Sequence, residues 1–430
     1  MVDRGGTPPE LARHLGTRDA VVIGLGSMIG AGVFAAFAPA ARAAGTGLLV
    51  GLAIAAAVAY CNATASAQLA AQYPTSGGTY LYGRERLGPW WGFLAGWGFV
   101  VGKTASCAAM ALTFAAYAVP GPVWLQRLVA LAGVLVLTTV NYHGITRTAA
   151  LARVLVAISL AVLLLAVSVV LANGSVSTHR LGGWDAVTSA GPYGVLQSAG
   201  LLFFAFAGYA RIATLGEEVR NPAQVIPRAI LWALGIVVLL YLVVAVALLL
   251  AGGPDRLATT SSPVIAAVEA VGAHWATPIV RIGAAAASLG SLLALVAGIG
   301  RTSLAMARNR DLPRWLASVH HRYQVPDHSE LAVAVVVSVL VLTTDVRGAI
   351  GFSSFGVLVY YGVANASAYT QQAPHRLWPR WLNVAGASGC TALAVTLPWQ
   401  AVITGVAMFA VGLLGRGFAA RRASPASRAP

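Results

Sequence analysis

Long apolar segments recur along the whole chain, and each one is bounded by charged residues, proline or glycine. Each segment has about 20 residues, the length that an α-helix needs to cross a hydrocarbon layer of about 30 Å. Lipid offers no partners for backbone amides, and the segments are too long and too uniformly apolar for barrel strands, so we expect helices. The pattern predicts an all-α integral membrane protein with about 12 transmembrane helices. The expected spans are residues 20–43, 47–71, 89–118, 123–142, 150–172, 194–217, 226–251, 277–304, 330–346, 349–370, 381–397 and 399–416.

The composition excludes a water-soluble protein, because 58% of the 430 residues are hydrophobic, only 10% are charged and the mean hydropathy is +0.76. A net charge of +15 would suggest a nucleic-acid partner in a soluble protein, but here the arginines sort by loop. With the N-terminus in the cytoplasm, most of them fall on the inner side, as the positive-inside rule requires. We therefore expect a multi-pass protein of the cell membrane, with both termini cytoplasmic, lipid around it and no nucleic-acid partner. The outer loops keep Arg42, Arg127, Arg180, Arg256, Arg281 and Arg347.

The cysteines and the N-terminal segment predict no further chemistry. Cys61, Cys107 and Cys390 lie inside spans without paired spacing, so we expect no disulfide, metal site or cofactor. The first 18 residues contain acids and prolines and lack the apolar core of a signal peptide. The first span itself is therefore expected to direct membrane insertion.

The first span contains GLGSMIGAG, Gly24 to Gly32, with four glycines in nine residues near the bilayer centre. Each glycine inside a helix costs about 1 kcal/mol relative to alanine. Two interpretations are open: close packing of helices through Gly26 and Gly30, or a break in the helix. The spacing G-x-G-x-x-x-G, with no strand before it, does not fit a dinucleotide fingerprint.

A second interruption lies in the sixth span, around Gly208 in FFAFAGYARIATLGEEVRNP. Irregular backbone at membrane depth is tolerated only where it faces a cavity, and paired breaks in corresponding positions of two halves indicate the substrate site of an inverted-repeat transporter. Spans one to five and six to ten, about residues 19–173 and 193–370, would be the repeats. The two halves are not visibly alike in sequence, so this prediction depends on the placing of the breaks.

The two breaks favour a zwitterionic ligand. Free amides at residues 27–32 suit a carboxylate, and free carbonyls at residues 204–208 suit an ammonium group. An amino acid carries both groups, and burying them without partners would cost several kcal/mol. The predicted substrate-binding residues are Ser27, Met28, Ile29, Gly30, Ala31, Gly32, Phe204, Ala205, Phe206, Ala207 and Gly208.

Five motifs in order along the chain resemble the amino acid-polyamine-organocation permeases, in particular their bacterial amino-acid branch. They are GLGSMIGAGVF at Gly24, YPTSGGTYLYGRERLGPWWGFLAGW at Tyr73, NYHGITRTAALARVL at Asn141, FFAFAGYARIATLGEEVRNPAQVIPRAI at Phe203 and RTSLAMARNRDLP at Arg301. The resemblance implies a five-plus-five inverted-repeat fold with broken first and sixth helices, two additional helices, and proton-driven or exchange transport. It divides the chain into a cytoplasmic segment (1–18), a transport core (19–370), the two additional helices (371–418) and a basic tail (419–430).

The same resemblance implies that Phe206 is an aromatic lid over the substrate; the alternative is that it packs against the tenth span. The chain departs from the family pattern at two places. Some proton-coupled relatives carry a lysine where Ser159 stands, and the cationic-amino-acid relatives carry an acid where Gly102 stands. The proton-handling lysine is therefore missing from its expected helix.

Lys103 is the only lysine of the chain, and it lies in the third span. Trp90 and Trp91 mark the membrane interface, and Lys103 lies about 18–20 Å further along the helix, near the midplane. An ionisable group at this depth is a functional hypothesis by default. Its candidate acceptors are carbonyls freed by the breaks, hydroxyls such as that of Ser159, and the substrate carboxylate.

We expect Lys103 to replace the sodium ion of sodium-coupled relatives and to tether the first span to the scaffold. A desolvated lysine can release its proton, whereas arginine cannot, so the tether offers a route to proton coupling. A permanently charged structural lysine is the alternative. Arg211 is a second deep cation, expected either to gate the inner path by pairing with Asp19 or Glu218 or to form a structural pair.

Other function classes fit less well. A passive channel would need polar rings on several helices, whereas the polar residues cluster at two breaks. A membrane enzyme would need a His, Asp or Glu cluster at membrane depth, which the sequence lacks. A cation without a membrane-depth acid disfavours cationic substrates. The sequence predicts proton-coupled symport of small or apolar neutral L-amino acids; an exchanger, a carrier of cationic amino acids or polyamines, and the oligomeric state are left open.

Overall fold

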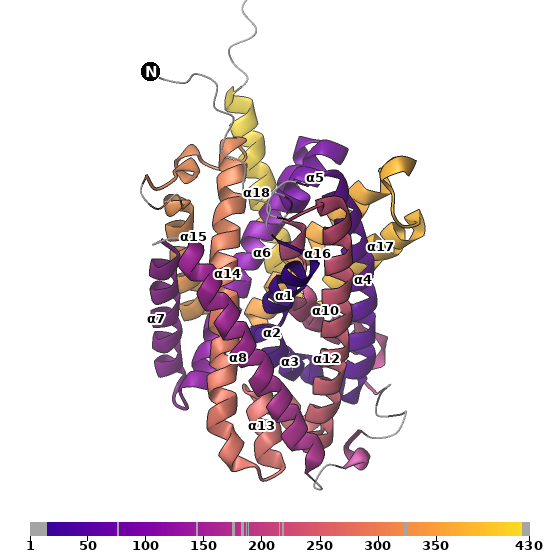
Figure 1. The fold of residues 1–430 in the computed structure, drawn as a ribbon, viewed down its shortest axis with the longest axis vertical. Helices are drawn as coiled ribbons and strands as arrows, with labels where there is room; N and C mark the ends of the chain where they lie inside the picture. The colour runs from indigo at the N-terminus through magenta and orange to yellow at the C-terminus, as the bar shows by residue number, and fades with distance from the viewer. Residues whose placement is uncertain are drawn as a thin grey trace, which may run out of the picture.

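A computed structural model describes residues 15–423 except 75–76, 143–144, 174–176, 182–184, 186, 188, 215, 217–218, 322 and 324. Within these residues the chain forms helices and no strand, which confirms the predicted all-α membrane fold (Figure 1). The α-helices are α1 Thr17–Met28, α2 Ala31–Ala35, α3 Phe37–Ala44, α4 Leu48–Gln72, α5 Gly78–Leu87, α6 Pro89–Ala118, α7 Val123–Tyr142, α8 Ile145–Ala172, α10 Gly191–Phe206, α11 Ala210–Ala213, α12 Pro222–Thr259, α13 Pro263–Ala270, α14 Thr277–Arg308, α15 Asp327–Thr343, α16 Val346–Tyr369, α17 Arg380–Thr396 and α18 Trp399–Ala423. The 3₁₀ helices are η1 Gly45–Gly47, η2 Thr178–Leu181, η3 His274–Ala276, η4 Arg314–Ala317 and η5 Ala373–His375.

Each of the expected spans coincides with a helix or with a run of consecutive short helices. In the described chain, nine helical segments are long and apolar enough to cross a membrane, and the helices of spans six, nine and eleven are shorter. The first span consists of α1, α2 and α3, and the sixth consists of α10 and α11, so both predicted interruptions are present. Two short helices, α5 and α13, were not expected.

Helix ends follow from local chemistry. Proline occupies the first turn of α6, α12 and α13, where its missing N–H costs nothing. Gly88, before α6, has a φ of 104°, a left-handed conformation that favours glycine. Asp345 caps α16 by accepting a hydrogen bond of 2.7 Å from the Gly348 N–H.

The core is organised around α6, which packs against α14 and α16. Its backbone lies against that of α16 at Gly102, because a Cβ there would lie 3.3 Å from the Gly356 Cα. Small residues let membrane helices approach in this way. The position where cationic-amino-acid relatives carry an acid is therefore a helix-packing contact in this chain.

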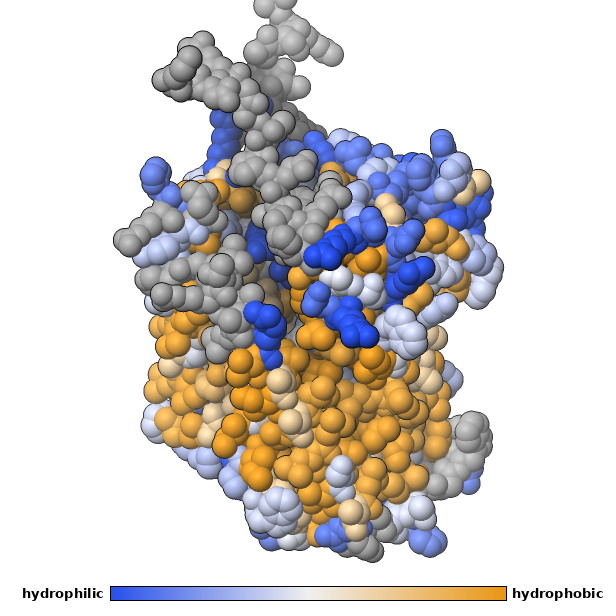
Figure 2. All heavy atoms as spheres, in the orientation of Figure 1, coloured by the Kyte–Doolittle hydropathy of each residue, from blue (hydrophilic) through white to orange (hydrophobic). Residues whose placement is uncertain are grey.

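The two ends of the bundle differ in polarity. Figure 2 shows a broad hydrophobic band below a hydrophilic cap. We call the capped end, with α5 and η4, the α5 end, and the opposite one the α13 end (Figure 1). Arg84, Arg86 and Arg314, predicted to be inside, belong to α5 and η4. At the α13 end, Arg42 donates to the Ala258 carbonyl.

Candidate functional site

The break in the first span separates α1 from α2 at Ile29 and Gly30. The Ile29 N–H still donates to the Leu25 carbonyl at 2.7 Å, but Gly30 is extended, with φ −130° and ψ −150°. The backbone amides that follow therefore leave the helical ladder of α1. A Cβ on Gly30 would lie 1.8 Å from the Ser291 Oγ of α14, so only glycine fits here.

The break in the sixth span lies between α10 and α11, at residues 207–209. The Ala207 N–H reaches the Phe204 carbonyl at 3.4 Å, and the Gly208 N–H reaches the Phe206 carbonyl at 2.8 Å. This irregular backbone frees the Ala207 carbonyl for side-chain donors.

The two breaks touch each other. A Cβ on Gly208 would lie 2.2 Å from the Ser27 carbonyl oxygen, and a Cβ on Gly32 would lie 2.8 Å from the Ala205 Cβ. Segments about 180 residues apart in the chain therefore meet at glycines.

Tyr241 of α12 joins the two breaks. Its hydroxyl lies 2.6 Å from the Met28 carbonyl and 3.1 Å from the Ala205 carbonyl, and its ring packs 5.1 Å from the Phe206 ring. Sequence reasoning missed this residue. A tyrosine inside an apolar span is the available signal, because a buried phenol needs a hydrogen-bond partner.

Lys103 is 6% exposed and donates from Nζ to the Ala207 carbonyl oxygen at 3.0 Å. The Tyr361 hydroxyl of α16 donates to the same oxygen at 3.4 Å. Carbonyls freed by the breaks were among the expected acceptors. Lys103 was expected to hold the first span, but the carbonyl that it bonds, Ala207, belongs to the sixth span. The Ser159 hydroxyl bonds within its own helix, to the Leu155 carbonyl.

Two cavities lie beside Lys103. The larger, of about 60 Å³, is lined by Ser27, Phe99, Lys103, Ala207, Gly208, Ala210, Arg211, Thr214, Ser291, Ala294, Leu295, Gly298, Arg301 and Thr302. The smaller, of about 20 Å³, is lined by Ser27, Met28, Gly30, Gly32, Lys103, Ser106, Met110, Phe204, Ala205, Gly208 and Leu295. Most of the predicted substrate-binding residues line one cavity or both. Ile29, Ala31 and Phe206 are the predicted residues outside both linings, and Phe206 lies against Tyr241 of α12.

The larger cavity extends past Arg211 of α11 and Arg301 of α14. Arg211 contacts the Thr214 hydroxyl at 3.5 Å. Of its two expected partners, Glu218 lies outside the described residues, and Asp19 accepts a hydrogen bond from the Gly16 N–H at the start of α1. The gating role of Arg211 stays a prediction.

At the α13 end, Tyr117 joins three helices. It is fully buried, and its hydroxyl donates to the Phe34 carbonyl of α2 at 2.8 Å. The same oxygen accepts the Val264 N–H of α13 at 3.4 Å, and the Phe34 and Tyr117 rings meet edge to face. These contacts fasten α2, the part of the first span that follows the break, to α6 and α13.

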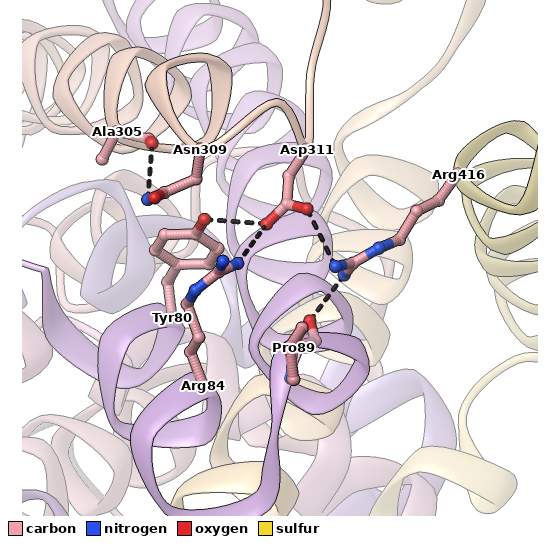
Figure 3. A network of polar contacts seen from close by, with 7 residues as sticks. All are labelled: Tyr80, Arg84, Pro89, Ala305, Asn309, Asp311 and Arg416. Atoms are coloured by element: carbon pink, nitrogen blue, oxygen red, sulfur yellow. Dashed lines mark hydrogen bonds and ion pairs between the residues drawn. The ribbon is translucent and has the colours of Figure 1, made fainter. Parts of the chain in front are cut away.

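At the α5 end, Asp311 is the centre of a polar network (Figure 3). Its carboxylate accepts hydrogen bonds from Tyr80 at 2.7 Å and Arg84 at 3.3 Å, and it pairs with Arg416 of α18 at 3.0 Å. Burial and the neighbouring carboxylate raise the pKa of the Tyr80 phenol. The adjacent Tyr82 donates to the Ala213 carbonyl of α11 at 3.3 Å, so α5 also contacts the sixth broken helix.

Known proteins similar to this chain are transporters. The family model described as "Amino acid permease" matches residues 15–417. An uncharacterized transporter of Mycobacterium tuberculosis (strain ATCC 25618 / H37Rv) is 58% identical over 414 residues, covering 95% of this chain and 92% of the relative. The branched-chain amino acid permease of Bacillus subtilis (strain 168) is 28% identical, over 74% of this chain and 71% of its own. The chloroplastic cationic amino acid transporter 7 of Arabidopsis thaliana is 28% identical, over 92% and 72%.

Proposed function

The chain belongs to the amino acid permease family and is a multi-pass membrane transporter of amino acids, and we propose that it works as a proton-coupled symporter. The observation that carries this proposal is the meeting of the two helix breaks at Lys103, the one buried ammonium beside both cavities in the described chain. Alternating access between the two ends of the bundle would then expose this site to one side of the membrane at a time.

The substrate would lie between the breaks. Of the amides expected to be free at residues 27–32, those of Ile29 and Gly30 are bonded to the Leu25 and Met28 carbonyls, so the amides at the start of α2 would receive the substrate carboxylate. Carbonyl oxygens at residues 204–208, each of which has two lone pairs, suit the substrate ammonium group. The Lys103 ammonium has three N–H donors, of which one is used by the Ala207 carbonyl, so it retains donors for a carboxylate in either cavity.

This arrangement supports coupling of substrate and proton. A carboxylate within reach of Lys103 would stabilise its charged form, and protonation would in turn strengthen carboxylate binding by the same free energy. Substrate and proton would therefore bind together on one side and leave together on the other.

The cavity linings favour a neutral substrate with a small or apolar side chain. Met110, Phe204 and Leu295 form apolar walls in the smaller cavity. Lys103, Arg211 and Arg301 line the larger cavity and would repel a cationic side chain in a low dielectric.

We propose that the protein lies in the cell membrane and that its α5 end faces the cytoplasm. The arginines of α5 and η4 at this end support the orientation, which also puts the end of α18 inside. The larger cavity would then lead toward the cytoplasm.

The test is uptake of a panel of labelled amino acids into proteoliposomes in sodium-free buffer, with and without an inward proton gradient. Gradient-dependent accumulation of neutral amino acids is the expected result. Uptake only into vesicles loaded with amino acid would replace symport by exchange. Uptake of none of the panel under either condition would overturn amino acid transport by this site.

A further inference from the structure

Tyr241 lies where the ends of the two broken helices converge, yet it lines neither cavity. It is 0% exposed, and its oxygen lies 2.6 Å from the Met28 carbonyl, at the last residue of α1, and 3.1 Å from the Ala205 carbonyl, near the end of α10. Carbonyls in the last turn of a helix lack their usual partners within the helix. The Met28 carbonyl accepts the Gly30 N–H at 2.9 Å, and the Tyr241 hydroxyl offers both carbonyls a donor from another helix.

A phenol has a single proton, so one O–H serves both carbonyls. Sharing it requires the two carbonyls to lie within reach of the same oxygen. The two breaks are also in close contact nearby, where Gly32 of α2 lies against Ala205 of α10. The hydroxyl therefore bonds both carbonyls only at a particular separation of the two breaks. The Tyr241 ring packs on Phe206 and so fixes the position of the hydroxyl relative to α12.

We propose that Tyr241 is a positioning residue of the substrate site. Its hydroxyl holds the end of α1 against the end of α10, so that the irregular backbone of the two breaks lines one cavity. Without the O–H, the Ala205 carbonyl loses this donor and the Met28 carbonyl keeps only the Gly30 N–H, so the breaks move apart or rotate to find other partners. Tyr241 acts through the backbone of Met28 and Ala205, without touching the ligand. The inference rests on the proposed function, because it assumes that the cavity binds the transported amino acid.

Tyr241→Phe removes the hydroxyl and keeps the ring, and Tyr80→Phe is the matched control. Tyr80 is 2% exposed, and its hydroxyl makes a hydrogen bond of 2.7 Å to Asp311, far along the chain from both breaks. Both variants therefore lose one short hydrogen bond of a buried phenol, but only one of them loses it at the breaks.

The experiment uses the full chain and the labelled amino acid that the wild type takes up fastest in the panel. Its Kd, the KM of uptake and the melting temperature without substrate are measured for all three proteins. We expect Tyr241→Phe to raise Kd and KM about tenfold, equivalent to about 1.4 kcal/mol. Tyr80→Phe should leave Kd and KM within about twofold of the wild-type values. It should lower the melting temperature at least as much as Tyr241→Phe does.

A Kd for Tyr241→Phe within twofold of the wild type would overturn the inference and leave the proposed function standing. Loss of folding in Tyr241→Phe, with Tyr80→Phe folded, would also overturn it, because the hydroxyl would then stabilise the fold and not the site. Absence of uptake by the wild type would overturn the proposed function and the inference with it.

Discussion

The two ends of the bundle are held together by different kinds of contact. At the α13 end, α2, α6 and α13 meet at the neutral hydroxyl of Tyr117, and Arg42 and Arg281 donate to backbone carbonyls. At the α5 end, charged side chains meet at Asp311, and the larger cavity runs between Arg211 and Arg301. Within the described residues, both ion pairs involve Asp311.

The difference lies in which contacts would have to break for each end to open. At the α13 end, neutral hydrogen bonds of the buried Tyr117 phenol join α2 to α6 and α13, whereas at the α5 end Asp311, which follows α14, pairs with arginines of α5 and α18. We therefore expect Tyr117 to keep the α13 end shut and the Asp311 network to fasten the α5 end. Changes that act on one end, or on the lysine between them, test this view.

The largest effect is expected from Lys103→Met, which removes the charge between the two ends. We expect gradient-driven uptake to fall about 100-fold, because the charge-assisted bond to the Ala207 carbonyl and the candidate carboxylate partner are both lost. Lys103→Arg is the control that keeps a charge but cannot release its proton, so it should bind substrate and lose the response to pH. Uptake by Lys103→Met at the wild-type rate would refute a role of this ammonium in transport.

Asp311→Ala, at the α5 end, should destabilise the protein more than Asp345→Ala does at the α13 end. Asp311 is buried between two arginines, and removing one partner of a buried pair costs about 3 kcal/mol. Asp345 caps α16 through one hydrogen bond from the Gly348 N–H, so Asp345→Ala should cost about 1 kcal/mol. Thermal unfolding in detergent compares them, and equal losses would show that the Asp311 network does not fasten its end.

Tyr117→Phe should loosen the α13 end by about 1 kcal/mol, which favours the state open at that end about fivefold. A Met110→Cys reporter in the smaller cavity, in a chain without its native cysteines, would be labelled faster by an impermeant thiol reagent from the outside. The same reporter with Tyr117 intact is the control. An unchanged labelling rate would mean that Tyr117 does not keep this end shut.

The smallest effect concerns pH at the α5 end. The raised pKa of Tyr80 means that the fold favours the protonated phenol, so its contribution to stability is present below about pH 10 and is lost as pH rises through the folded pKa. Tyr80→Phe should therefore be less stable than the wild type by about 1 kcal/mol below pH 10. The gap should narrow at higher pH; a constant gap in unfolding free energy would contradict the protonation argument.

The helices were predictable because their signal is local. Apolar length located the spans, and the glycines around Gly30 and Gly208 located both interruptions, since a helix break depends mainly on the residues at the break. α5 escaped prediction because a polar ten-residue segment between two spans resembles a loop in sequence.

The partners within the site were less predictable because they depend on how distant segments pack. A freed carbonyl was a predicted acceptor for Lys103, but the choice of Ala207 over a carbonyl of the first span depends on which break the Nζ atom reaches in the packed structure. Tyr241 is 213 residues from Met28, and no local pattern joins them. For the same reason the contact of the Phe206 ring with Tyr241 was not predicted; the resemblance implied a lid, with packing against the tenth span as the alternative, and the lid stays a prediction.

The contact between Gly102 and Gly356 has a mechanical consequence. The contact holds α6 and α16 together as a closely packed pair, with Lys103 on α6 and Tyr361 on α16. Both side chains donate a hydrogen bond to the same atom, the carbonyl oxygen of Ala207. A displacement of the sixth-span break relative to this helix pair would therefore weaken both hydrogen bonds together, and not one after the other.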